Sequence, residues 1–250
     1  MKTKLPVALQ LYSVRDEMEK DFIGTLKKVA DIGYKGVEFA GFGDLPAARL
    51  KEVLESLGLV PVGSHTSVEL LLGDLGGVID YNLTLGNKYI VCPFNTYQSK
   101  EAIVKASQLY NEIGEKICAG GLEFLYHNHD FEFKKYDGEY GIDIIFNGVK
   151  PENMAAEIDS GWVFYAGVDP AAYVRSYTGR CPLVHIKDFK STEGRSFTEI
   201  GNGIVDIEAI AAAAVEAGTK WLIAEQDESS IPQLESVRIS FENLKKMGLA

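Results

Sequence analysis

The sequence predicts a single (β/α)₈ barrel (TIM barrel), in which a closed ring of eight parallel strands is surrounded by helices. The chain has 250 residues, a length typical of this fold. Eight short apolar runs alternate with segments of helical periodicity, and parallel strands require such helical crossovers. Because no linker rich in Ser, Gly or Pro divides the chain, we expect one domain over residues 1–250.

The expected strands are Pro6–Ser13, Gly36–Phe42, Val60–Ser67, Lys88–Cys92, Leu122–His129, Met154–Gly161, Leu183–Asp188 and Trp221–Asp227. Helices are expected at Asp21–Ile32, Leu50–Leu57, Ser99–Ala119 and Asp206–Ala217, and glycine follows each of them. A doubly wound sheet is the alternative fold. A dinucleotide-binding sheet would need a glycine-rich turn after its first strand, and QLYSVRDE contains no glycine.

Charge and hydropathy exclude several classes of partner. The net charge of −11 argues against general binding of nucleic acids or anionic membranes, although a small basic pocket for a phosphorylated substrate stays open. No run approaches the ~20 apolar residues of a membrane span, and the start of the chain lacks a signal-peptide pattern. The three separated cysteines (Cys92, Cys118 and Cys181) suit reduced thiols. We therefore expect a cytoplasmic protein with a small-molecule partner.

Histidines and carboxylates gather in or near the ends of the expected strands. All four histidines lie there (His65, His127, His129 and His185), together with Glu38, Glu157, Asp159, Glu225 and Asp227. Strand alternation places Glu157 with Asp159, His127 with His129, and Glu225 with Asp227 on one face. In a barrel these polar side chains would point inward, near the mouth where active sites form.

Imidazole and carboxylate groups together are ligands for Zn, Mn, Fe or Co, and several oxygens favour Mn or Mg. Burying several carboxylates without a cation is costly, and a metal ion would remove that cost. The sequence therefore predicts a divalent metal site, with Mn first and Zn, Co or Mg as alternatives.

Each residue also has a structural interpretation. A single histidine at a strand end is commonly a hydrogen-bonded structural residue. Asp159 could cap the following turn, and the segment 227–230 could start the last helix. Lys187 could pair with Glu157, and Trp162 could serve packing alone. The Gly201-Asn202-Gly203 turn could be a simple loop or could contact substrate or phosphate. Five strand ends with the same chemistry favour one shared site over separate explanations.

Seven motifs spread from the first strand to the eighth carry a family resemblance: QLYSVRD, GYKGVEFAG, YHNHDFEF, AEIDSGW, GRCPLVHIKD, EIGNGIVD and AEQDES. Through them the chain resembles the xylose isomerase-like TIM barrel superfamily, in its sugar phosphate isomerase/epimerase branch. The resemblance implies one divalent ion held by Glu, Asp, His and Glu at the ends of strands five to eight. Asp159, His185 and Glu225 match the last three ligands. The first position is His127 here, which leaves three alternatives: His127 is the fourth ligand, Glu132 takes its place, or the ion is held more loosely.

The same resemblance implies a mechanism. Epimerases of the superfamily use two metal-bound glutamates as a facing acid/base pair, and His127 interrupts that pair here. Inosose dehydratases and keto-glycoside lyases have a similar barrel and remove a proton next to a ketone. We hypothesise that the ion polarises a carbonyl of a keto-sugar or related polyol while Glu225, His127 or His129 removes the adjacent proton. Lys187 would stabilise the developing oxyanion.

Supporting roles complete the hypothesis. Glu38, His65 and Glu157 would bind hydroxyls or orient the ligands, and Trp162 would form a wall for a sugar ring. The outcome is isomerisation or epimerisation, with dehydration or lyase chemistry as the alternative.

Two other classes compete with a sugar enzyme. An abasic-site endonuclease would need several metals and a basic surface, which the charge disfavours. A non-catalytic sugar-binding barrel is disfavoured by the retained ligands. A homo-oligomer is left open.

Overall fold

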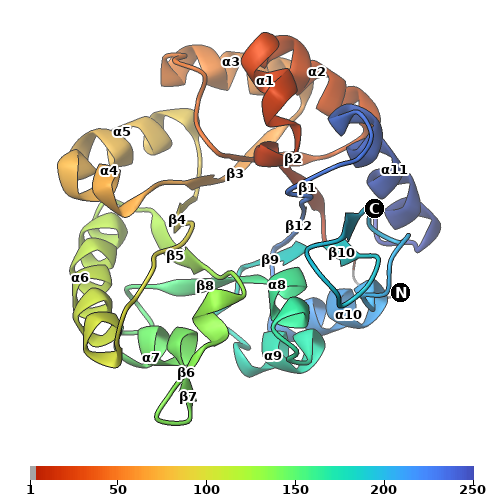
Figure 1. Cartoon of the computed structure of the whole chain (residues 1–250). Coiled ribbons are helices and arrows are strands. Elements are labelled where there is room, and N and C mark those ends of the chain that lie inside the picture. Colours follow the sequence, from red (N-terminus) through yellow and green to blue (C-terminus); the bar gives the residue numbers. More distant parts are fainter. Residues whose placement is uncertain (1–3) are drawn as a thin grey trace.

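The computed structural model describes residues 4–250, and its main strands close into one parallel barrel (Figure 1). The order around the barrel is β1-β12-β9-β8-β5-β4-β3-β2, with every neighbouring pair parallel. This confirms the predicted fold. The first three residues of the expected domain lie outside the described part of the chain.

The barrel strands are β1 (Val7–Gln10), β2 (Gly36–Phe39), β3 (Val60–His65), β4 (Tyr89–Cys92), β5 (Glu123–His127), β8 (Ala155–Asp159), β9 (Leu183–Ile186) and β12 (Trp221–Ala224). All eight lie within predicted strands. Seven of the predicted strands run at least two residues past the observed carboxyl end, and only the strand predicted at Lys88–Cys92 ends where β4 ends. The extra residues belong to turns and short helices at the barrel mouth, where the chain leaves the sheet.

Helices surround the barrel: α1 (Arg15–Lys20), α2 (Phe22–Ile32), α3 (Ala47–Leu57), α4 (Val68–Gly73), α5 (Leu75–Leu85), α6 (Lys100–Ala119), α7 (Gly141–Asn147), α8 (Ser160–Tyr165), α9 (Pro170–Ser176), α10 (Ile207–Ala217) and α11 (Gln233–Lys246). Two 3₁₀ turns, η1 (Leu11–Val14) and η2 (Phe131–Phe133), follow β1 and β5. Two small hairpins pair β6 (Lys135–Tyr136) with β7 (Glu139–Tyr140) and β10 (Asp188–Phe189) with β11 (Phe197–Thr198). No helix within residues 4–250 has the length and hydropathy needed to cross a membrane.

Three of the four predicted helices begin one residue early because their first residue is the N-cap. The side chains of Asp21, Ser99 and Asp206 each accept a hydrogen bond from the backbone N–H three residues later. Such caps satisfy N–H groups that have no partner inside the helix. The fourth, α3, instead begins three residues before the predicted Leu50, directly after Pro46.

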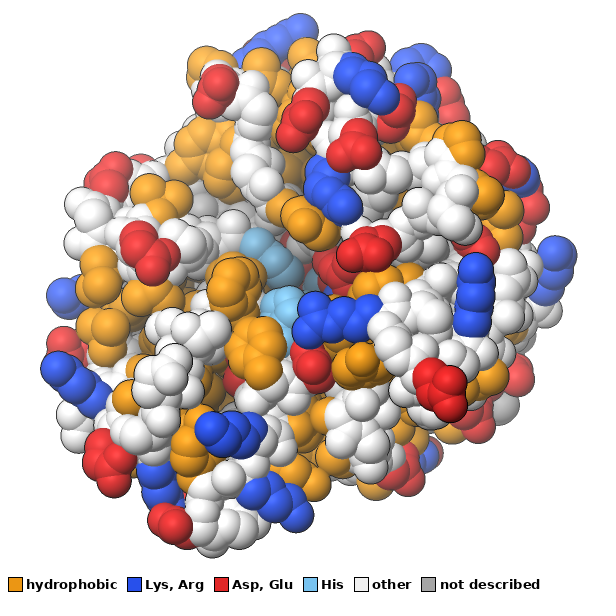
Figure 2. Space-filling model, in the orientation of Figure 1, with side chains coloured by type: hydrophobic (Ala, Val, Ile, Leu, Met, Phe, Trp, Pro, Cys, Tyr) orange, Lys and Arg blue, Asp and Glu red, His pale blue; other side chains and the backbone are white. Residues whose placement is uncertain are grey.

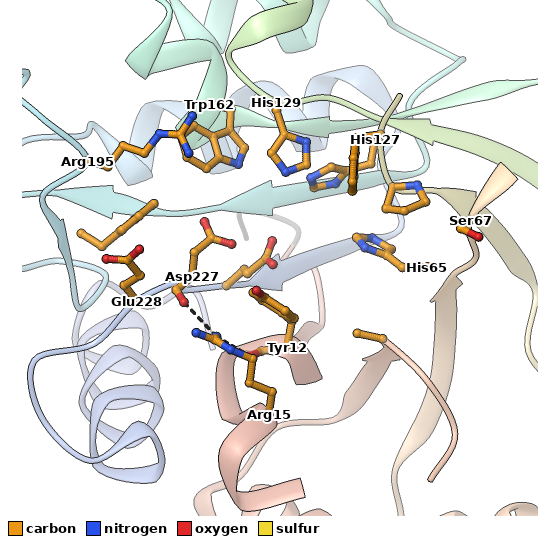
Figure 3. A pocket seen from close by; sticks show the side chains of 15 residues that line it. Tyr12, Arg15, His65, Ser67, His127, His129, Trp162, Arg195, Asp227 and Glu228 are labelled. Carbon is orange, nitrogen blue, oxygen red and sulfur yellow. Dashed lines mark hydrogen bonds between the residues drawn. The ribbon is translucent and has the colours of Figure 1, made fainter. Parts of the chain in front are cut away.

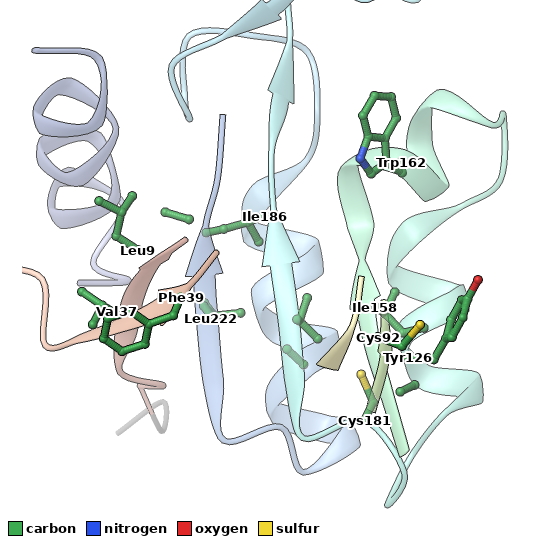
Figure 4. Close-up of a cluster of buried hydrophobic side chains, with 14 of the residues drawn as sticks. Leu9, Val37, Phe39, Cys92, Tyr126, Ile158, Trp162, Cys181, Ile186 and Leu222 are labelled. Atoms are coloured by element: carbon green, nitrogen blue, oxygen red, sulfur yellow. The ribbon is translucent and has the colours of Figure 1, made fainter. Parts of the chain in front are cut away.

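Apolar side chains form two layers. Residues that point outward from the strands, such as Leu9, Val37, Ile158 and Leu222, pack against the helices (Figure 4). The smaller inner layer fills the barrel itself and consists of Ala8, Val62, Tyr89, Val91, Leu125, Leu183 and Ile223. The three cysteines are free thiols, and Cys92 and Cys181 belong to the outer layer.

The inward positions change from apolar to polar toward the carboxyl end of the strands. In β5 Leu125 is followed two residues later by His127, and in β9 Leu183 is followed by His185. Since alternate residues of a strand share a face, the polar residue stands directly above the apolar one. This arrangement confines the histidines and carboxylates to one end of the barrel.

Candidate active site

A cavity of about 540 Å³ opens at the carboxyl ends of the strands. Figure 2 shows histidine atoms at the bottom of this depression, with hydrophobic, acidic and basic side chains around it. Every barrel strand, or the loop after it, contributes to the lining: Tyr12, Arg15, Ala40, His65, Ser67, Pro93, Phe94, His127, His129, Trp162, Arg195, Phe197, Glu225, Asp227 and Glu228 (Figure 3).

His185 is held between two glutamates. Its Nε2 lies 2.7 Å from Glu38 Oε2, and its Nδ1 lies 2.7 Å from Glu225 Oε2. Burial alone would lower the pKa of this imidazole, but Glu157, Glu38 and Glu225 outweigh burial and hold the pKa well above its usual value. His185 therefore carries a proton on each ring nitrogen in this arrangement.

His127 is held by one carboxylate only. Its Nδ1 lies 2.9 Å from Glu157 Oε1, and its Nε2 faces Asp159 Oδ2 at 3.6 Å. Burial, followed by the positive charge of His185, lowers the pKa of His127 well below its usual value. His127 is therefore neutral, and with its proton on Nδ1 the lone pair of Nε2 points toward Asp159.

Glu38 and Glu157 lie beneath the cavity floor and are fully buried. Glu38 Oε2 accepts a hydrogen bond from Gln10 Nε2 at 2.8 Å, and His65 Nε2 lies 3.2 Å away. His65 Nε2 also lies 2.9 Å from Glu157 Oε1. A side chain at Gly63 would place its Cβ 2.7 Å from Glu38 Oε1, so the missing side chain makes room for this carboxylate.

The charges of this lower layer balance one another. Burial alone would raise the pKa of Glu38, but the positive charges of His65 and His185 outweigh burial and hold this pKa well below its usual value. Burial lowers the pKa of His65, and the two glutamates reverse that effect and raise it to about 10. Burial keeps the pKa of Glu157 above its usual value. Glu38 therefore pairs as a carboxylate with imidazolium groups.

Asp159 divides its two oxygens between the fold and the site. Oδ1 accepts from the backbone N–H of Trp162 at 3.0 Å and caps α8, while Oδ2 points toward His127 and Lys187. The side chain of Asn128 fixes the position of Asp159, since it accepts from the Asp159 N–H at 3.0 Å and donates to the Asp159 carbonyl at 3.2 Å. Asp159 therefore caps α8 with one oxygen, as the capping interpretation expects, and its other oxygen stays free to face the site.

Lys187 is buried among three carboxylates. Its Nζ lies 2.8 Å from Asp159 Oδ2, 2.9 Å from Glu225 Oε2 and 3.0 Å from Asp227 Oδ2. The suggested pairing with Glu157 is wrong, because the side chain leads toward the mouth rather than toward the floor. Burial would lower the pKa of Lys187, but the carboxylates reverse that effect and hold the pKa well above its usual value.

The donor atoms of His127, Asp159, His185 and Glu225 all lie within 4.8 Å of one another. These are the four residues predicted as ligands. His127 contacts Glu157 through one ring nitrogen and faces Asp159 with the other. His185 likewise contacts Glu38 through one ring nitrogen and Glu225 through the other. In metal sites, an outer carboxylate such as Glu157 or Glu38 fixes the tautomer of the histidine that binds the ion. The residues therefore fit a divalent ion, which would replace the Nδ1 proton of His185.

The charge argument for a metal is weaker than the donor geometry. Lys187, His65 and His185 already supply positive charge to the buried carboxylates. The cost of burying the carboxylates therefore does not by itself require an ion. The support comes from the neutral His127 and from the convergence of the four donors.

A sequence model of the xylose isomerase-like TIM barrel family matches residues 26–247. The chain belongs to this family. An inosose dehydratase of Clostridium botulinum (strain Alaska E43 / Type E3) is 28% identical over 145 residues, which are 50% of this chain and 48% of that protein. The chain therefore spans about half the length of this curated relative.

Two solved structures share the fold of this xylose isomerase-like barrel. A sugar phosphate isomerase/epimerase from Parabacteroides distasonis ATCC 8503 superposes with a TM-score of 0.86 at 24% identity, over 97% of this chain and 98% of that one. The IOLI protein with a bound zinc atom superposes with a TM-score of 0.75 at 15% identity, over 98% and 97% of the two chains.

Glu132, the other suggested ligand of this xylose isomerase-like barrel, is occupied elsewhere. One carboxylate oxygen accepts from Tyr126 Oη at 2.9 Å, and the other accepts from the His129 backbone N–H at 2.8 Å. Burial raises the pKa of Glu132 to about 8. Glu132 thus holds the loop that carries His129 and lies outside the group of four donors.

His129 and Trp162 line the cavity wall. Their ring centroids are 5.5 Å apart, and the Arg195 guanidinium lies 4.9 Å from the Trp162 ring on its way to an ion pair with Asp130. Burial lowers the pKa of His129 to about 3, so this imidazole is neutral near neutral pH. The aromatic wall expected from Trp162 is present in the cavity.

Several residues of the site were missed in the sequence. Gln10, Tyr12 and Arg15 lie in or just after β1, within a motif that was quoted without a role, and Asn128 stands between the two histidines of YHNH. Their position at the carboxyl ends of β1 and β5 was the available signal. Arg195 lies in the β10–β11 hairpin, where composition gives no comparable signal.

Two structural interpretations are decided by the fold. The segment 227–230 does not start the last helix, which begins at Gln233, because Asp227 turns into the cavity. The Gly201-Asn202-Gly203 turn is a loop bound to buried Asp188. That carboxylate accepts from the backbone N–H groups of Phe189, Gly201, Gly203 and Val205 at 2.9–3.0 Å.

Proposed function

We propose that this protein is a divalent-metal-dependent enzyme that removes a proton next to a carbonyl of a keto-sugar or related polyol and returns it, as in isomerisation or epimerisation. The observation that supports this proposal most is the convergence of His127, Asp159, His185 and Glu225 at the floor of the cavity. Mn is the expected ion, with Zn, Co or Mg as alternatives. The ion supplies Lewis-acid polarisation of the carbonyl.

Asp227 is the group best matched to the proton transfer. It lines the cavity, and burial raises its pKa to about 6 despite the nearby Lys187 ammonium. A base is most effective when its pKa lies near the working pH. Glu225 was one of the three residues considered as the base, with His127 and His129. Lys187 overcomes the burial of Glu225 and keeps its pKa well below the usual range, so we assign Glu225 to ion binding.

Lys187 and His129 complete the assignment. Lys187 Nζ is held by three carboxylates and provides a fixed positive charge for oxygen atoms that gain charge in the reaction. His129 is neutral and contributes a hydrogen bond to a substrate hydroxyl from the wall. Glu38 and Glu157 are fully buried, so their role is to orient His185 and His127. His65 lies between these glutamates and the cavity.

Dehydration of a keto-polyol is the second candidate. The curated relative is an inosose dehydratase, and Asp227 can hold a proton for a departing hydroxyl at slightly acidic pH. Both candidates begin with removal of the same proton. They differ in whether that carbon regains a proton or a neighbouring hydroxyl leaves.

Incubation with keto-sugars and inososes in deuterated water tests the proposal. Deuterium in recovered sugar without an unsaturated product supports isomerisation, and an unsaturated product supports dehydration. If fully metal-loaded protein gives neither deuterium incorporation nor an unsaturated product, proton abstraction is refuted. Elemental analysis of the wild type and of Asp159→Ala tests the ligand assignment, and Asp159→Asn serves as the control that keeps the α8 cap. Unchanged metal content in both variants contradicts the assignment.

A further inference from the structure

A second hollow of about 220 Å³ adjoins the cavity. The linings of the two hollows share Tyr12, Arg15 and Ala40, so the hollows adjoin each other along η1 and the loop after β2. This aryl groove, as we name it, is lined by those three residues together with Leu11, Met18, Glu19, Phe22, Gly41 and Gly43. It contains none of the four histidines.

The two hollows differ in chemistry. Histidines and carboxylates lie in the cavity, whereas the groove side chains are apolar or aromatic except for Arg15 and Glu19. A free sugar carries hydroxyls around its whole rim, and these hydroxyls would find few hydrogen-bond partners in an apolar hollow. An apolar group buried there gains roughly 25 cal/mol per Å² of surface removed from water.

A fixed pair of side chains stands between the hollows. The Arg15 guanidinium lies 4.2 Å from the centroid of the Tyr12 ring, and its Nη1 donates to the Tyr12 carbonyl at 3.0 Å and to the Asp227 carbonyl at 2.8 Å (Figure 3). Tyr12 nevertheless remains 42% exposed, so its ring is available to a ligand. A ligand crossing from one hollow to the other would pass this pair.

The loop after β2 leaves the groove open. Gly41 has a φ of +113°, a conformation that favours glycine, and a side chain added there would meet no atom within 4 Å. At Gly43 an added Cβ would instead lie 2.4 Å from the Phe22 ring. Gly41 therefore leaves free space beside the groove, and Gly43 lets the backbone approach the Phe22 ring.

We propose that the substrate is a keto-sugar in the form of an aryl glycoside, whose ketone-bearing ring occupies the cavity and whose aromatic aglycone occupies the aryl groove. This inference rests on the proposed function and names its substrate class. The cavity of about 540 Å³ lies within the range of roughly 300–1,000 Å³ that encloses drug-sized ligands, and the groove extends it in one direction. The Tyr12 and Phe22 rings provide aromatic faces for an aryl group.

The test uses methyl β-D-glucopyranoside and phenyl β-D-glucopyranoside as unreactive binding probes that lack the ketone, each titrated by calorimetry into metal-loaded protein. We expect the phenyl glycoside to bind at least about tenfold more tightly. In Met18→Trp, which adds bulk within the groove, this ratio should fall toward one. Lys20→Trp is the matched control, because Lys20 lies on the same helix with a side chain that is 69% exposed and outside the groove. Glu19→Phe serves in place of Met18→Trp if the latter does not fold.

Equal affinities in the wild type, a ratio that survives the groove variant, or no binding of either glycoside would each overturn the inference. Tight binding of long alkyl glycosides but not of the phenyl glycoside would assign the groove to a lipid chain and would overturn it as well. Deuterium exchange into free keto-sugars is measured on the same preparation. If deuterium exchanges into keto-sugars but the protein does not prefer the phenyl glycoside, only the glycoside inference is refuted. If no deuterium exchanges, the proposed function is refuted.

Discussion

Lys187 Nζ lies 2.8 Å from Asp159 Oδ2, and neither side chain is more than 1% exposed. An ammonium group therefore stands beside a carboxylate that we assign to a divalent ion. The two cations are compatible because Lys187 shares its charge among Asp159, Glu225 and Asp227. Asp159 Oδ2 also faces the Nε2 of neutral His127 at 3.6 Å. The lysine fixes the carboxylates, and the ion would add the Lewis acid.

Replacing Lys187 with Met should destabilise the metal-free protein by roughly 3–5 kcal/mol, because the change leaves buried carboxylates without their cation. Chemical denaturation with and without Mn²⁺ measures this effect. Added Mn²⁺ should recover part of the loss by binding the folded state. A metal-free stability equal to that of the wild type would show that Lys187 does not neutralise this cluster.

Replacing Glu157 with Gln should weaken metal binding about 10–100-fold, because Glu157 Oε1 lies 2.9 Å from both His127 Nδ1 and His65 Nε2 and orients the ligand without touching the ion. Competition with a chelator gives the affinity. Glu123→Gln is the control, since Glu123 pairs with Lys88 at the opposite end of β5. An equal loss in both variants would contradict an orienting role.

Replacing Glu132 with Gln should change how stability depends on pH. Burial raises the pKa of Glu132 from an unfolded value near 4.5 to about 8, so the folded state retains a proton that the unfolded state has lost. The wild type should lose at least ~1 kcal/mol of stability as the pH rises from about 4.5 to 8. Glu132→Gln, whose amide can serve both Tyr126 and His129, should lack this loss. Parallel stability curves from denaturation at several pH values would refute the assignment.

The sequence predicts the barrel and the gathering of site residues because both depend on local periodicity. An apolar residue followed two positions later by a polar one, as in Leu125 and His127, indicates which face of the strand points inward and where the strand reaches the mouth of the barrel. The N-caps Asp21, Ser99 and Asp206 are likewise recognisable beside their helices.

Side-chain contacts across the barrel could not be predicted from the sequence, because they depend on the register between strands that are distant in the chain. Pairing of β8 with β9 aligns Asp159 with His185, and pairing of β5 with β8 aligns His127 with Glu157. Nothing near Lys187 in the sequence indicates that it reaches Asp227 and not Glu157. The lowered pKa of His129 follows from burial that only the packed structure reveals.

The pH dependence of the reaction distinguishes Asp227 from the other proton carriers. Burial raises the pKa of Asp227 to about 6, and proton removal requires its carboxylate form. The rate should therefore rise with pH through about 6 and level off above it. His129, with a pKa lowered to about 3, stays neutral throughout this range and cannot produce such a rise.

Asp227→Asn should lower kcat by about 10²–10⁴-fold and remove the rise near pH 6, while metal content stays unchanged because Asp227 lies outside the four donors. His129→Gln should lower kcat less and keep the rise, since it removes a hydrogen bond to substrate and leaves the base in place. The measurements are pH–rate profiles and the rate of deuterium incorporation for both variants. If the rise near pH 6 persists in Asp227→Asn but disappears in His129→Gln, then His129 is the base.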